Sequence, residues 1–114
     1  MAKRGQAGAV AEAAGQEEIF SAAASLFRVL SAPMRLKIIK SLCVNEKNVS
    51  ELLAEIQTTQ PNMSQHLHTL YQAGILDKRR EGVQIHYRII DERVANLCKV
   101  VCTQVAGDLD APAS

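Results

Sequence analysis

Residues 58–74, TTQPNMSQHLHTLYQAG, concentrate hydrogen-bonding side chains without charge. The stretch holds amides, hydroxyls and two histidines, and it contains no Asp, Glu, Lys or Arg. Amides and hydroxyls donate and accept hydrogen bonds in fixed directions, so they can read base edges in the major groove of DNA. A carboxylate at such a surface would repel phosphate. The chemistry that these residues predict is recognition of base pairs in double-stranded DNA.

On a helical wheel, at about 100° per residue, the stretch separates into two faces. Met63, Leu67, Leu70 and Tyr71 share one side, which we expect to face a core. The polar side and the first turn supply the candidate base-reading residues, which are Gln60, Asn62, Ser64, Gln65 and His68. A solvated surface helix that merely lacks charge is the alternative interpretation.

Residues 75–90, ILDKRREGVQIHYRII, change the period from 3.6 to 2 and predict a β-hairpin that turns at Glu81-Gly82. A basic hairpin beside a reading helix can hold phosphates or enter the minor groove. Arg79, Arg80 and Gln84 are the candidate residues for this contact. The alternative is an ordinary edge strand guarded by charge. The two features together, in this order, favour DNA binding.

The remaining pattern predicts helices on both sides of these two segments. Helical spacing begins at Gln16, and the third and fourth helices are joined by only a few residues, as in a helix-turn-helix. The predicted caps and stops are Ser31, Asn48, Thr58 or Thr59, Gly74 and Asp91. The predicted fold is mainly α with a β-hairpin wing, a winged helix-turn-helix of order α-α-α-α-β-β-α.

Composition and length fit one small domain of 114 residues with a formal net charge of +1. We expect residues 1–15 to be a disordered arm, residues 16–106 to form the domain, and residues 107–114 to be a flexible tail. No apolar run reaches the length of a membrane span, and no secretory leader is apparent. We therefore expect a cytoplasmic protein with no membrane partner. No enzyme or cofactor motif occurs, so we expect neither catalysis nor a cofactor.

The first and last helices carry more apolar residues than a small core needs. The excess includes Ile19, Phe20, Phe27, Val100, Val101 and Val105. Half-sites one helical turn apart require two reading helices at a fixed spacing. We therefore expect a homodimer that is closed by the first and last helices.

Four segments, taken in order, resemble the ArsR/SmtB family of bacterial winged-helix repressors. They are LSAPMRLKIIKSL (30–42), VSELLAEI (49–56), QPNMSQHLHTLYQAGIL (60–76) and RREGVQIHYRI (79–89). Together they reach from residue 30 to residue 89, within the predicted domain of residues 16–106. The resemblance implies a homodimeric repressor whose operator binding is weakened by an inducer.

The resemblance also implies which inducers to expect. Asn48-Val49-Ser50 stands where metalloid-sensing members carry Cys-Val-Cys. Asp91 matches one ligand of the zinc-type members, but Arg93 and Gln104 stand where His is needed. Neither of these metal sites is expected in this chain.

One branch of the family senses reactive sulfur or oxidants through one Cys on the second helix and one on the last. Here Cys43 ends the second helix, and Cys98 and Cys102 lie on the last, at a shifted register. We predict release from the operator by thiol chemistry at Cys43 and Cys102, with Cys98 as a further candidate. The alternatives are an arsenite or soft-metal site made by all three thiols, thiols that only fill the core, and a protein-interaction module that binds no DNA.

Overall fold

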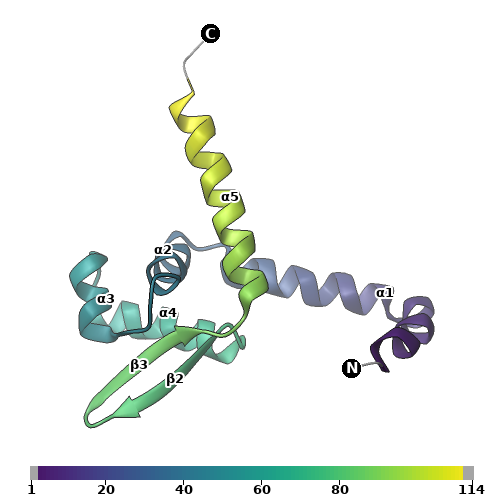
Figure 1. Cartoon of the computed structure of the whole chain (residues 1–114), viewed down its shortest axis with the longest axis horizontal. Coiled ribbons are helices and arrows are strands. Elements are labelled where there is room, and N and C mark those ends of the chain that lie inside the picture. The colour runs from purple at the N-terminus through teal and green to yellow at the C-terminus, as the bar shows by residue number, and fades with distance from the viewer. Residues whose placement is uncertain (1–2, 112–114) are drawn as a thin grey trace.

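The computed structural model describes residues 3–111, with side chains from residue 15 onward. Its elements are α1 (Lys3–Leu30), α2 (Pro33–Leu42), β1 (Lys47–Asn48), α3 (Val49–Glu55), α4 (Gln60–Gln72), β2 (Leu76–Glu81), β3 (Gln84–Ile89) and α5 (Glu92–Asp110). Figure 1 shows the β2–β3 hairpin, the wing, beside α3 and α4, while α1 and α5 project from this body. The winged helix-turn-helix prediction is confirmed, with the short strand β1 added.

The sheet has three antiparallel strands in the order β1-β3-β2. Lys47 of β1 pairs with Tyr87 of β3, which also pairs with Lys78 of β2. Because Glu81 pairs with Gln84, the hairpin turns at residues 82–83, one residue later than predicted. Gly82 takes a φ of +65° there, which favours glycine. The sequence did not indicate β1, since two residues are too few to show a period.

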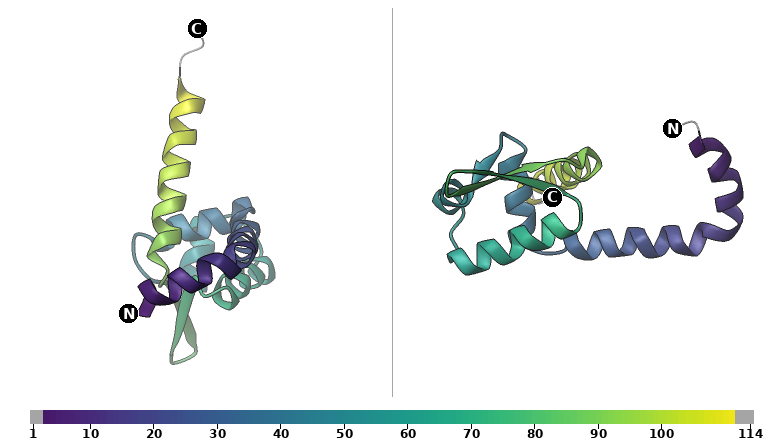
Figure 2. Two further views of the ribbon diagram at one scale, coloured as in Figure 1. Left: turned by 90° about the vertical axis from the view of Figure 1, so that its right-hand side faces the viewer. Right: turned by 90° about the horizontal axis from the view of Figure 1, so that it is seen from below.

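The core is built from one apolar side of α2, α3, α4 and α5 and from the start of β2. Its fully buried side chains are Ile38, Ile39, Leu52, Met63, Leu67, Leu70, Ile75, Leu76 and Val94. Leu30 is the one side chain of α1, among those described, that joins this buried core. Helix α1 is therefore attached to the body mainly at its C-terminal end, as the views of Figure 2 also show.

Local capping interactions fix where the helices begin and end. Asn48 and Glu51 form a capping box at the start of α3, and the Thr59 hydroxyl accepts a hydrogen bond from the Asn62 amide at the start of α4. Asp91 caps α5, and Gly74, with a φ of +79°, ends α4. These predicted caps are confirmed. They could be predicted from the sequence because capping depends on residues only two or three positions apart.

Ser31 does not cap α2 as predicted. Ala32 occupies the N-cap position, and its extended backbone (φ −141°, ψ 124°) is the conformation that a following proline imposes. The Ser31 hydroxyl instead donates to the Arg28 carbonyl, 2.9 Å away, at the end of α1. The residue thus finishes one helix instead of starting the next.

Both terminal helices are longer than the sequence pattern predicts. Helix α1 begins at Lys3, within the stretch expected to be a disordered arm, and α5 continues through Gly107 to Asp110, into the expected tail. Residues 1–2 and 112–114 lie outside the described residues. Over the described part of the chain, no single helix is long and apolar enough to cross a membrane. Gly15–Leu30 and Pro33–Leu42 meet that criterion only as a pair bent by 87°.

Substitutions of two adjacent residues of α4 test which face of the helix packs into the core. Leu67→Ala should lower the free energy of unfolding by about 2–5 kcal/mol, because it removes a fully buried side chain from the core. His68→Ala, at an exposed position, should change it by at most about 0.5 kcal/mol. Urea unfolding of both variants measures the difference, and equal losses would contradict the assigned faces.

Candidate nucleic-acid interface

The outer side of α4 presents most of the predicted base-reading residues to solvent. Gln60, Ser64, Gln65 and His68, here called the reading face, are exposed. The fifth candidate, Asn62, is half-buried, and its amide donates to the Thr58 hydroxyl at 2.8 Å. Asn62 therefore holds the turn before α4, while the reading face keeps its donors and acceptors toward solvent.

A groove of about 330 Å³ runs between the start of α4 and the wing. Gln60 and Ser64 line it from α4, and Gln84 lines it from β3. The Gln84 side-chain oxygen accepts a 2.7 Å hydrogen bond from the Asn48 amide, which ties the wing to the start of α3. The fold thus brings these three predicted residues together, although Gln84 uses its oxygen within the protein.

The two predicted wing arginines differ in their surroundings. Arg79 forms ion pairs with Glu46 and Glu81, and its hydrogen bond holds the pKa of the Glu46 carboxyl below its usual value. Arg80 donates only to the Gly82 carbonyl, at 3.1 Å, and has no carboxylate partner within residues 15–111. Arg80 is therefore free to meet a phosphate, whereas Arg79 must first leave Glu46.

The other cations of the wing are also occupied. Arg88 pairs with Asp77 at 3.2 Å. The Lys78 ammonium lies 4.4 Å from the centre of the Tyr71 ring, a cation–π contact that joins the base of the wing to α4. Of the four Lys and Arg side chains of the wing, Arg79 and Arg88 are thus paired with carboxylates, Lys78 lies over an aromatic ring, and Arg80 has neither kind of partner within residues 15–111.

Arg35 and His66 form a connection that the sequence did not indicate. One Arg35 guanidinium nitrogen, Nη1, lies 3.0 Å from His66 Nδ1, and Arg35 Nε donates to the Val29 carbonyl. Because a guanidinium can only donate, His66 Nδ1 accepts and the ring is neutral. Burial and the charge of Arg35 lower the pKa of His66. Arg35 thus joins the end of α1, the start of α2 and the middle of α4.

The three cysteines gather where α5 packs on α2. Cys43 and Cys102 are exposed, Cys98 is buried, and all three are free thiols. The pKa of Cys98 is raised, first by burial and then by the nearby Cys102 and Cys43 thiols. Within the described residues, no three His, Cys, Asp or Glu side chains are grouped as metal ligands. The alternative three-thiolate site would require Cys98, which is buried, to turn toward the two exposed thiols.

Comparison with known proteins identifies the family. The family model for the bacterial regulatory protein arsR family matches residues 32–78. The biofilm growth-associated repressor of Agrobacterium fabrum is 40% identical over 78 residues, which are 68% of this chain and 67% of that protein. The chain belongs to the arsR family. The predicted ArsR/SmtB resemblance is confirmed, and this arsR-family chain is a transcriptional repressor.

Solved structures agree with this assignment. The homodimeric winged helix-turn-helix DNA-binding domain of Mb0332 from Mycobacterium bovis has a TM-score of 0.75 and 25% identity, covering 88% of this chain and 93% of that one. Reduced HlyU from Vibrio cholerae has a TM-score of 0.70 and 25% identity, covering 84% of this chain and 96% of that one. The arsR-family fold therefore extends well beyond the matched segment.

The neutral state of His66 predicts a pH dependence of stability. Because the pKa of His66 is lower in the folded chain, the unfolded chain takes up a proton first as the pH falls below about 6.5. Folding stability should therefore be lost on acidification between about pH 7 and pH 5. His66→Gln keeps an acceptor for Arg35 but does not titrate, so it should flatten this decline in urea unfolding. Parallel declines in wild type and variant would rule out His66 as the group responsible.

Proposed function

We propose that the chain is a homodimeric repressor that reads operator DNA with the reading face of α4 and leaves it after thiol chemistry at Cys43 and Cys102. One observation supports DNA reading most directly. The exposed face of α4 carries uncharged amide and hydroxyl side chains, and it lies opposite three fully buried residues of the same helix. Such side chains match the donor and acceptor pattern of base edges.

The wing would hold the DNA backbone while α4 enters the major groove. Arg80 supports this role because it is exposed and has no carboxylate partner within residues 15–111. Gln60, Ser64 and Gln84 line one groove next to it. Arg79 would contribute once phosphate replaces Glu46.

The exposed apolar side chains of α1 and α5 support the homodimer. They are Ile19, Phe20, Phe27, Val100, Val101, Val105 and Leu109. Exposed apolar patches of this kind mark protein–protein contacts. Both helices project from the body, so a second copy could cover them without touching the wing (Figure 1). The Mb0332 domain is itself described as homodimeric.

The proposed thiol switch would use two exposed cysteines, Cys43 at the C-cap of α2 and Cys102 on α5. A Cys102 thiolate would attack the terminal sulfur of a hydropersulfide, RSSH, and the RS group would leave as RSH after taking up a proton, so that Cys102 becomes a persulfide. The Cys43 thiolate would then attack the inner sulfur and release hydrogen sulfide. In the net reaction two thiols and RSSH give one disulfide, RSH and H₂S. The exposure of both thiols supports their access to such a reagent.

The wing arginines test the DNA contact. We expect Arg80→Ala to reduce the slope of log affinity against log salt by about one. Arg79→Ala should reduce it less, because Glu46 and Glu81 already neutralise Arg79. Glu46→Gln, the matched control, should strengthen binding by freeing Arg79. Fluorescence anisotropy on a duplex that the protein selects from a random library measures all three. If the chain shows no salt-dependent affinity for DNA, the result would instead favour a protein-interaction module.

The cysteines test the switch. Cys43→Ser and Cys102→Ser should each abolish release of bound DNA by a hydropersulfide, because each removes one sulfur of the crosslink. Cys98→Ala should retain release, since Cys98 is buried. DNA release and intact mass are recorded on the same samples. Normal release by both Ser variants would show that the switch is not built from these thiols.

A further inference from the structure

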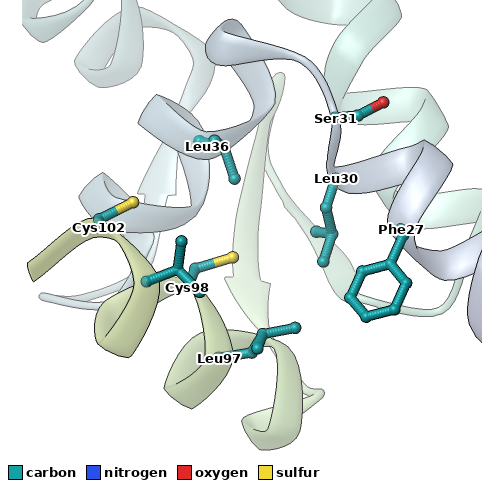
Figure 3. A pocket seen from close by; sticks show the side chains of 8 residues that line it. Phe27, Leu30, Ser31, Leu36, Leu97, Cys98 and Cys102 are labelled. Carbon is teal, nitrogen blue, oxygen red and sulfur yellow. The ribbon is translucent and has the colours of Figure 1, made fainter. Parts of the chain in front are cut away.

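A cavity of about 390 Å³ opens between the end of α1, the start of α2 and the middle of α5. Figure 3 shows Leu30, Leu36 and Leu97 converging on it, with the Cys98 side chain directed inward and Cys102 one helical turn along α5. Its size falls within the range of about 300–1,000 Å³ that small-molecule sites occupy. Two of the three thiols of the chain therefore lie in the wall of a ligand-sized space.

The wall of this cavity carries no charge. Its remaining side chains are Ser31 and two residues, Phe27 and Val101, that also belong to the exposed apolar faces assigned to the second copy. The Ser31 hydroxyl points away from the other lining groups and donates to the Arg28 carbonyl (Figure 3). A charged ligand in this cavity would lose part of its hydration without gaining a counter-charge or a hydrogen-bond donor. This loss would raise the free energy of its binding. An uncharged, apolar guest would instead bury its carbon atoms against leucine and phenylalanine.

The two thiols in the wall are not equivalent. Cys98 is only 8% exposed, and burial raises its pKa, so it is a poor nucleophile. Cys102 is exposed and lies in the same wall. A reagent held in the cavity would therefore meet Cys102 as the attacking thiolate.

We propose that this cavity is the reagent site of the switch and that it selects apolar, uncharged hydropersulfides over charged ones such as glutathione persulfide. The inference rests on the proposed thiol function and names its inducer class. The organic group of the reagent lies against Leu30, Leu36 and Leu97. The Cys102 thiolate attacks the terminal sulfur, the S–S bond of the reagent breaks, and the organic thiol leaves with a proton.

The test compares benzyl hydropersulfide with glutathione hydropersulfide on the full-length dimer. Mass spectrometry gives the rate at which each donor modifies Cys102, and the same chain unfolded in urea gives the intrinsic rate of each donor. Each rate on the folded chain is divided by the intrinsic rate of the same donor. This normalised rate should be about tenfold higher for the benzyl donor than for the glutathione donor, corresponding to about 1.4 kcal/mol.

A charge placed at the cavity should reverse this preference. Ser31→Lys adds a cation at the exposed rim of the cavity, outside the apolar side chains assigned to the second copy, and should raise the normalised rate of the glutathione donor while lowering that of the benzyl donor. Gln104→Lys adds the same charge to α5 outside the cavity and should leave the ratio as in wild type. All variants are assayed at concentrations at which they are dimeric.

Each outcome of this test decides one claim. Equal normalised rates for the two donors, with Cys102 modified by both, would overturn the selection but leave the thiol switch standing. A cavity filled by the second copy in the dimer would give that same result. Failure of both donors to modify Cys102 would overturn the switch and the inference together.

Discussion

The burial of Met63, Leu67 and Leu70 is the constraint on which the rest of the structure depends. All three have no exposed surface, so α4 cannot turn about its axis without pulling large apolar groups from the core. A rotation by one residue, about 100°, would turn Ser64 and His68 toward the apolar core. The outward direction of the reading face therefore follows from core packing. A helix held in this way can offer flexible, uncharged side chains to DNA without loss of fold.

The same helix is tied to the rest of the molecule by a small number of polar contacts. Lys78 lies over Tyr71 at the base of the wing, and Asn48 binds Gln84 farther along it. Arg35 links α4, through His66, to the Val29 carbonyl near the end of α1. Leu30 and Leu36, adjacent to this link in sequence, line the cavity that holds Cys98 and Cys102. The thiol side and the DNA side of the molecule are thus joined by a short series of contacts.

Sequence patterns predicted the parts of the fold that depend on near neighbours. The two faces of α4, the strand alternation of the wing and the capping box at Asn48 each involve residues a few positions apart. Glu46 and Arg79 are 33 residues apart, and Arg35 and His66 are 31 apart, so their pairing depends on strand register and helix packing. For that reason the sequence indicated a basic wing, whereas the structure pairs Arg79 and Arg88 with carboxylates. The burial of Cys98 between two exposed thiols likewise required the packing of α5.

Whether α4 reads base pairs is tested most directly by selecting duplexes from a random-sequence library with the purified chain and, in parallel, with Gln65→Ala. Wild type should enrich an inverted repeat whose half-sites lie about one helical turn, roughly 10–10.5 bp, apart. The variant should still bind but lose its preference at one base pair of each half-site. Enrichment of no sequence by wild type, or an unchanged preference in the variant, would contradict base reading by this face.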